Sequence, residues 1–420
     1  MINGFEKTII ADKVDFYLAK EQRFTTERLT ATILLPLKKS TAAEYAILAR
    51  LLVRCCKEHP TFTLLSKKLA KLYGSGLDSS VLKMGENQAI VIMANGISNK
   101  YAITGEDIIG ELCGLLCKVI FEPRVENGEF FAEDVEQERR LLLEQIDSEF
   151  NEKRSYALKR TTEIMCEGED YGVMRYGDRA AVEAVTPKSL YVAWQRMLQT
   201  AVFNFSFVGK TSPATAQAVI KENFSKIIRT PAQLQTKVVT TVADIKNVNE
   251  PADVAQAKLI MGFRTGSAES LGDTFATRLA IFVLGGNASS KLFVNVREKL
   301  SLCYYCSARS DRQKGLMFID SGVEKENIEK AKAAILSELD DMKNGKISDF
   351  EIEAAKLNLC NSARSYYDTA SGCEAWLTSQ YLDRKILTIE QFIERINEVT
   401  LDEIVEASQK LVLDTVYCLS

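Results

Sequence analysis

Among the residue types that bind metals or act as catalytic bases, histidine is nearly absent from this chain. Its single histidine, His59, stands directly before Pro60 at the end of an expected helix. Protein zinc sites use histidine, cysteine or carboxylate ligands in a tetrahedral arrangement, so one histidine restricts the metal sites this chain could build. We interpret His59 as a capping or surface residue.

The ten cysteines are also expected to be structural. The N-terminal sequence MINGFEKTII has no basic segment followed by an apolar one, so nothing indicates secretion, and reduced, buried thiols are the expected state. Cys303 and Cys306 form a Cys-x-x-Cys motif inside the strand-like run CYYCSA. Residues three apart in a strand point to opposite faces, so we favour a structural role for this pair over a redox or metal role.

Other catalytic patterns are equally weak. Gly285-Gly286-Asn287 matches neither a phosphate loop nor a dinucleotide-binding motif and is expected to be a turn. The sequence has no Gly-x-Ser-x-Gly motif, and a Cys–His nucleophilic pair would have to use His59.

Composition indicates a large soluble protein of more than one domain. The 420 residues are 46% hydrophobic, which is enough to bury two cores, and two domains of about 200 residues each are expected. The net charge of −4, with both signs interspersed, gives no reason to expect binding to nucleic acid or to an acidic membrane surface. No apolar run reaches the length of a membrane span, and we expect a cytoplasmic protein.

The clearest element is a helix over residues 41–59, where apolar residues recur at 3.6-residue spacing after a capping box of Thr41 and Glu44. A second helix is expected over residues 63–73, with Gly74 ending it. Further strands are expected at residues 14–18, 29–37, 79–84, 88–94, 202–208 and 257–263, and further helices at 107–121, 133–152, 181–200, 213–228 and 273–284.

The second half of the sequence repeats the first. Arg-Ser-Tyr at residues 154–156 recurs at 364–366, an offset of 210, and the segment from Glu183 matches that from Asn397 at an offset of 214. This indicates a tandem duplication. The expected fold class is α+β, with two homologous αβ rolls whose mixed, mainly antiparallel sheets carry helices on one face. The expected domains are residues 1–228 and 246–420, joined by a linker at 229–245 where helical periodicity is lost.

Two stretches resemble the insulinase-like (pitrilysin-type, M16) metallopeptidases. One is FTLLSKKLAKLYGSGLDSS from Phe62, and the other is LGGNASSKLFVNVREKLSLCYYCSARSDRQKGLMFIDSGV from Leu284. The resemblance covers essentially the whole chain and agrees with the duplication, because that family is built from duplicated αβ rolls. The pattern is also similar to that of a bacterial branch associated with the 5-aminopentanol modification of elongation factor P.

The resemblance implies a zinc motif that this chain has lost. In the family the first helix carries His-x-x-Glu-His, in which the two histidines bind zinc and the glutamate activates water. The matching positions here run from Ala46 to Arg50, so Ala46 and Arg50 replace the histidines and Ala49 replaces the glutamate.

The third zinc ligand of the family is a glutamate on a later helix, seven residues after another functional glutamate. Matching EQERRLLLEQI places Glu138 on the earlier residue and Gln145 on the ligand position. Glu144 is one residue off, about 100° around the helix, and a register error of one would restore it. The resemblance therefore implies no metal and no cofactor.

Arg297 and Tyr304 match a retained pair of the family. There, an arginine and a tyrosine seven residues apart help hold the substrate and polarise its scissile carbonyl. The alternative is structural: Arg297 would pair with an acid such as Glu298 or Asp320, and Tyr304 would pack in a sheet.

Two functions remain open. In the first, the chain is a non-catalytic subunit that pairs with a homologous zinc-bearing peptidase subunit, helps enclose peptide substrate and contributes Arg297 and Tyr304 to the partner's site. In the second, it is a homodimeric peptide-binding or scaffold protein without a catalytic partner. Neither involves nucleic acid or a membrane.

Overall fold

The structure is a computed structural model that describes residues 4–420. Its contacts divide the chain into two compact units. The first unit consists of the chain up to Ile146 together with Val173–Gln235 and Tyr366–Tyr381. The second unit consists of Asp147–Gly172, Thr236–Ser365 and Leu382–Ser420.

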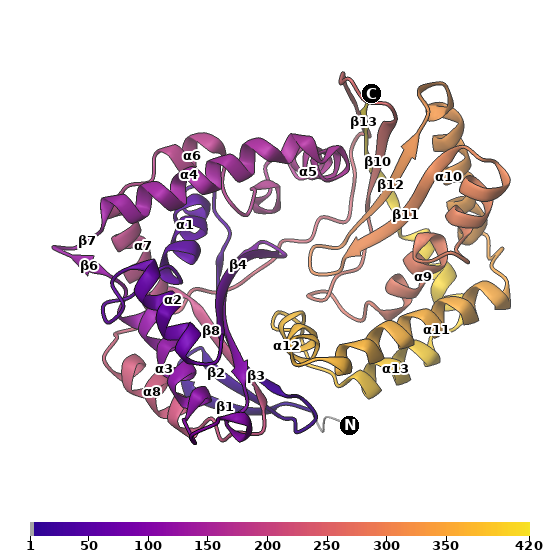
Figure 1. Cartoon of the computed structure of the whole chain (residues 1–420). Helices are drawn as coiled ribbons and strands as arrows, with labels where there is room; N and C mark the ends of the chain where they lie inside the picture. The colour runs from indigo at the N-terminus through magenta and orange to yellow at the C-terminus, as the bar shows by residue number, and fades with distance from the viewer. Residues whose placement is uncertain (1–3) are drawn as a thin grey trace. The chain divides into compact units, whose positions relative to one another are not determined.

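The first unit is built on a mixed sheet of six strands (Figure 1). Their order is β1 (Glu6–Ala11), β2 (Val14–Lys20), β8 (Val202–Gly209), β3 (Thr26–Pro36), β5 (Asn87–Ile97) and β4 (Gly76–Met84). Only the β2–β8 pair is parallel. β4 and β5 form the hairpin expected from the sequence, with Gly85 in the left-handed region at φ 55°.

One face of this sheet carries the main core of the first unit. Alternate residues of each strand point to it, such as Ile33 of β3 and Phe203 and Phe205 of β8, all fully buried. The helices of this unit's segments are α1 (Ala42–Leu52), α2 (Phe62–Lys71), α3 (Ile108–Phe121), α4 (Ala132–Ser148), α6 (Arg179–Glu183), α7 (Pro187–Thr200) and α8 (Ala214–Ser225). A short ribbon, β6 (Val125–Glu126) and β7 (Glu129–Phe130), lies before α4.

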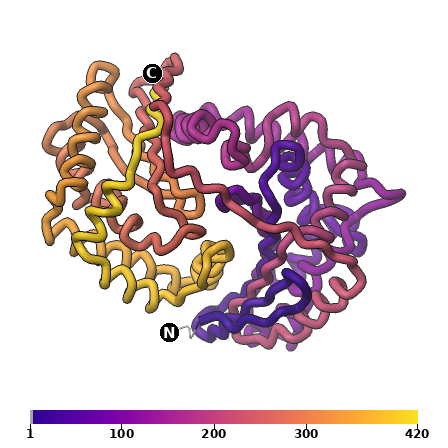
Figure 2. The backbone as a smooth tube through the Cα atoms, turned by 180° about the vertical axis from the view of Figure 1, so that it is seen from behind, coloured from indigo at the N-terminus to yellow at the C-terminus, as the bar shows by residue number. Residues whose placement is uncertain are grey.

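The second unit has a sheet of five strands in the order β11 (Cys303–Asp311), β12 (Leu316–Val323), β10 (Ala257–Arg264), β13 (Val412–Leu419) and β9 (Lys246–Glu250). β13 runs parallel to β9, which places the C-terminus beside the segment near residue 250 (Figure 2). The helices are α5 (Lys153–Met165), α9 (Phe275–Gly285), α10 (Ile328–Lys343), α11 (Asp349–Ser365), α13 (Ile389–Glu398) and α14 (Leu401–Gln409).

The two sheets have the same topology, which confirms the expected α+β fold of two homologous rolls. The order β9-β13-β10-β12-β11 reproduces β2-β8-β3-β5-β4, including the one parallel pair in each sheet. The predicted match at offset 214 is also seen in the structure. Thr186 and Thr400 are the N-cap residues of α7 and α14, and each forms a capping box.

The Arg-Ser-Tyr match at offset 210 is wrong. Arg154 is the second residue of α5 and follows a short 3₁₀ turn, whereas Arg364 lies near the end of α11 and precedes one. The turn and the helix after it correspond at an offset of 217 instead. The tripeptides are therefore similar by composition and not by structural position.

Each unit also contains a segment from the other half of the sequence. α5 packs on β10 and β13, on the face opposite the main core of the second unit, where Met165 fills the space that a side chain at Gly262 would take. α12 (Ala370–Thr378) packs in the same way on β3 and β8 of the first unit. The predicted domains were continuous, and the units are not. The predicted first domain begins at residue 1, and residues 1–3 lie outside the described part.

Candidate functional site

The first helix positions the residues that replace the zinc motif. α1 ends at Leu52 and not at residue 59 as predicted, because Val53 already closes its last turn, and the expected capping bond of Thr41 is absent. Ala46 and Ala49 are buried in the core of the first unit. Their methyl groups pack against apolar neighbours and offer no lone pair to a metal.

Arg50 occupies the position of the second histidine and binds the residues that match the remaining motif positions on α4. Its Nε donates to Oε2 of Glu138 at 3.2 Å, and its Nη1 donates to Oε1 of Gln145 at 3.2 Å. The Glu138 side chain is only 9% exposed, whereas that of Arg50 is 32% exposed. A guanidinium group is therefore held between two side chains of α4, those of Glu138 and Gln145.

The alternative register does not bring Glu144 to this place. Glu144 accepts a hydrogen bond from Arg140 on the exposed side of α4, at 2.6 Å. Gln145, one residue further on, is the side chain that reaches Arg50. The geometry therefore pairs the two positions that the sequence matching had paired.

A network of charges that sequence reasoning missed extends from Arg50 along α1 and α4. Arg54 donates to the second oxygen of Glu138 at 3.0 Å and to Asp134 at 2.9 Å. Arg124 donates to the other oxygen of Asp134 at 2.9 Å. Burial lowers the pKa of Arg54, but both carboxylates outweigh it and raise that pKa above its usual value. Arg50 near the end of α1 and Arg54 just after it face two acids four residues apart on α4, and this spacing is a signal that the sequence contains.

These residues do not fit a zinc ion. A guanidinium has only donors and stays protonated, and the amide oxygen of Gln145 is already hydrogen-bonded to it. Ala49 leaves no base to activate water. Within residues 4–420, no group of three histidine, cysteine or acidic side chains could hold a metal ion. The chain's one histidine, His59, lies 3.5 Å from the Glu58 carboxylate.

The Cys303–Cys306 pair differs from the prediction. A β-bulge between Cys303 and Tyr305 inserts one residue into β11, so the two cysteines point to the same buried face and not to opposite faces. The hydrogen bond with Cys306 lowers the pKa of Cys303, burial opposes this, and the charge of Arg297 adds to the lowering. All ten cysteines are buried, and no disulfide bond joins any of them.

The bulge also shapes the Arg297–Tyr304 pair. Arg297 lies on a π-helix, Leu292–Lys299, a rare conformation often found at functional sites. Its Nε donates to the backbone oxygen of Tyr304 at 2.9 Å, and its guanidinium lies 4.4 Å from the ring centre of Phe293. These two contacts fix the guanidinium while leaving its Nη groups available.

The geometry matches the structural alternative for this pair only in part. Glu298 lies 3.9 Å from Arg297, at the limit of an ion pair, and Asp320 pairs with Arg154 and Arg309 instead. Tyr304 does not pack in the sheet, because 62% of it is exposed. Both side chains can thus be reached by a molecule outside the second unit's core.

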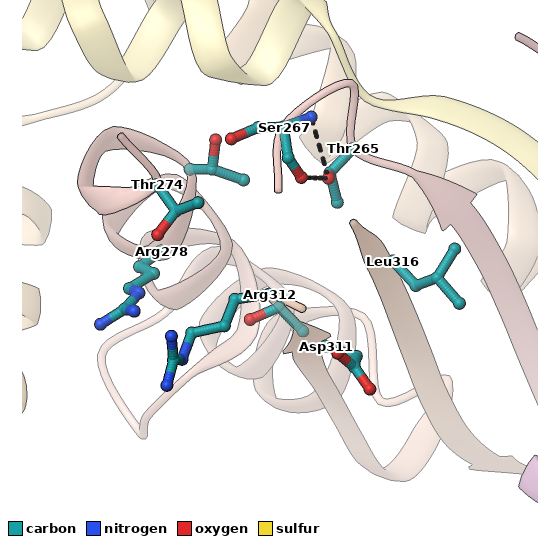
Figure 3. Close-up of a pocket in the computed structure, with 9 residues that line it drawn as sticks. Thr265, Ser267, Thr274, Arg278, Asp311, Arg312 and Leu316 are labelled. Carbon is teal, nitrogen blue, oxygen red and sulfur yellow. Dashed lines mark hydrogen bonds between the residues drawn. The ribbon is translucent and has the colours of Figure 1, made fainter. Parts of the chain in front are cut away.

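A small pocket in the second unit was not indicated by the sequence. Hydroxyl groups line it, with Thr265 and Ser267 joined by hydrogen bonds (Figure 3). Arg278 and Arg312 lie next to each other on one side, and both bind Glu269. Arg312 also binds Asp383. The charges around this pocket are therefore largely paired within the protein.

Comparison with known proteins identifies close relatives of the whole chain. Residues 184–359 match the family described as "Peptidase M16 inactive domain". The chain is 31% identical to the "Probable inactive metalloprotease YmfF" of Bacillus subtilis over 403 residues, which cover 96% of this chain and 95% of that protein.

Solved structures show the same fold. A conserved protein from Enterococcus faecalis superposes with a TM-score of 0.90 at 26% identity, covering 100% of this chain and 99% of that one. A peptidase M16 inactive domain from Pseudomonas fluorescens superposes with a TM-score of 0.80 at 15% identity, covering 99% and 98%. In the part of the chain that the structure describes, no helix is long and apolar enough to cross a membrane.

Proposed function

The chain belongs to the M16 peptidase family, as its sequence resemblance predicted, and we propose that it is a non-catalytic subunit that binds peptide together with a homologous zinc-bearing partner. It is an inactive metallopeptidase homologue, because the matched family and the Bacillus relative are both described as inactive. Ala46, Ala49 and Arg50 supply the chemical reason, because they leave neither zinc ligands nor a base.

The observation that carries the proposal is the state of Arg297 and Tyr304. A pair kept only for packing would be buried or fully satisfied, whereas Tyr304 is 62% exposed and Arg297 is fixed with donors to spare. A fixed guanidinium and a phenol can hold a peptide carbonyl and stabilise the negative charge that develops on its oxygen. Since this chain cannot activate water, such a pair would serve another chain's zinc centre.

A cytoplasmic location is part of the proposal. Ten buried cysteines without a disulfide bond suit a reducing compartment, where thiols stay reduced.

The test is reconstitution with the partner. The chain would be purified from its native cell to identify a co-purifying homologue with an intact zinc motif, and the pair then assembled from wild-type and variant chains. Arg297→Ala or Tyr304→Phe should lower turnover of a fluorogenic peptide about 10- to 1,000-fold, with complex mass and zinc content unchanged. Arg309→Ala is the matched control, because Arg309 is a half-exposed arginine on β11, the strand that carries Tyr304.

Two results would change the proposal. Wild-type turnover in both variants, with the complex intact, would make the pair structural. A chain that purifies as a homodimer, with no zinc-bearing homologue bound, would favour the alternative of a peptide-binding or scaffold protein.

A further inference from the structure

We propose that Arg50, held by Glu138 and Gln145, is a binding site for a carboxylate group of a peptide. This rests on the proposed function in one respect, that the chain binds peptide. The guanidinium has five N–H groups, of which one binds Glu138 and one binds Gln145. Among residues 4–420, Arg50 has no other partner. Its Nη2 and one hydrogen of Nη1 therefore remain for a ligand.

The charge around Arg50 favours an anion. Its only carboxylate partner, Glu138, uses its second oxygen for Arg54. Its other partner, Gln145, is a neutral amide. Arg54 and Arg124 both pair with Asp134, and Arg124 also pairs with the exposed Glu133. Arg50 is thus the least neutralised cation of the network, and its side chain is the most exposed of the three arginines.

The geometry favours a carboxylate over a neutral group. Two contacts from α4 hold the guanidinium in one plane, so its remaining donors are preorganised, and an arginine fork matches the two oxygens of a carboxylate. Nearby, Phe62 is 59% exposed, with its ring 6.0 Å from the Arg54 guanidinium. An exposed aromatic ring beside Arg54, which shares Glu138 with Arg50, suits an apolar side chain of the bound peptide.

A peptide carboxylate has two sources, the C-terminus and an Asp or Glu side chain, and three peptide pools distinguish them. All are decapeptide pools labelled with a fluorophore that has no carboxylate. One has a free C-terminus and no Asp or Glu, one is amidated with no Asp or Glu, and one is amidated with a single central Glu as its only acidic residue. Fluorescence polarisation measures their affinity for the wild-type full chain and for Arg50→Gln, Arg50→Lys and Arg140→Gln. Arg140 is an exposed arginine of α4 that pairs with Glu144, which makes its variant the matched control.

The wild type should bind at least one carboxylate-bearing pool about tenfold more tightly than the carboxylate-free pool. Arg50→Gln should remove this preference without changing the affinity for the amidated pool, Arg50→Lys should keep part of it, and Arg140→Gln should keep all of it. Equal binding of all three pools to the wild type would overturn the site while leaving peptide binding intact. Failure of every pool to bind would overturn the site and peptide binding together. The comparison of pools on the wild type needs no variant, so a poorly folded variant does not block the test.

Discussion

Replacing Glu169 with glutamine should strongly destabilise the second unit. Glu169 belongs to a buried group of four charges that joins Asp147–Gly172 to the sheet. It accepts two hydrogen bonds from Arg264, at 2.7 and 3.3 Å, and pairs with Lys314. Arg264 is 2% exposed and Lys314 is fully buried, and Asp414 completes the group by accepting from Arg264 at 2.8 Å.

The size of the effect follows from the charge that Glu169→Gln leaves behind. Lys314 would keep the backbone oxygen of Lys237 but lose the carboxylate of Glu169, with which it forms an ion pair. Removing one partner of a buried ion pair costs about 3–5 kcal/mol. For a domain of about 150–250 residues this corresponds to a fall in Tm of about 6–20 °C.

The assay is thermal and urea unfolding followed by far-UV circular dichroism. Both tryptophans, Trp194 and Trp376, lie in the first unit, so tryptophan fluorescence reports on that unit and separates its transition from the total. Glu167→Gln is the matched control: Glu167 is 80% exposed and 3.5 Å from Lys246. It should change the free energy of unfolding by less than about 1 kcal/mol.

The difference between Glu169→Gln and wild type should also depend on pH. Burial raises the pKa of Glu169, but Arg264 and Lys314 outweigh it and hold that pKa below its usual value of 4.5. A carboxylate with a lowered pKa stabilises the fold fully above the unfolded pKa, and this stabilisation disappears as the pH falls through the folded pKa. The difference should be constant near neutral pH and shrink below about pH 4.5. A Tm within 2 °C (roughly the effect of 1 kcal/mol) of the control at pH 7 would refute this reasoning.

Two further predictions follow from the packing of each unit. The isolated wild-type chain should bind no stoichiometric zinc after dialysis and cleave no fluorogenic peptide, whereas the combined replacement Ala46→His, Ala49→Glu, Arg50→His and Gln145→Glu should bind about one zinc by metal analysis; one tightly bound zinc in the wild type, lost with activity on chelation, would contradict this. Gly285→Ala should lower the free energy of unfolding by about 1–3 kcal/mol in urea titrations, because the new methyl would lie 2.5 Å from the backbone nitrogen of Ala308; Gly114→Ala, in open space on α3, should not.

Much of the fold could be predicted because local patterns determine it. The alternation of apolar residues predicted β3 and β5, and Gly85 predicted the turn of the hairpin between β4 and β5. The spacing of seven residues that placed Gln145 opposite Arg50 is a property of one helix, and it survives in the structure. Such features depend on residues close together in the sequence.

Other features could not be predicted because they depend on packing between distant segments. The bulge at Tyr304 follows from the pairing of β11 with β12, and one inserted residue reverses the face of every earlier side chain. The assignment of α5 to the second sheet has the same origin. An amphipathic pattern shows that a helix has a buried face but not which sheet buries it.

The lost zinc motif and Arg50 are best understood as one change. With histidine at position 50 and no metal, Glu138 would remain 9% exposed with a single cation, Arg54, on one oxygen. The other oxygen of Glu138 would then be buried without a partner, which is destabilising. Arg50 covers the second oxygen with a permanent charge and binds Gln145, which cannot ionise. The charge that a metal would have supplied is therefore supplied by the protein, so reversal of position 50 alone should lower stability and not recover zinc binding.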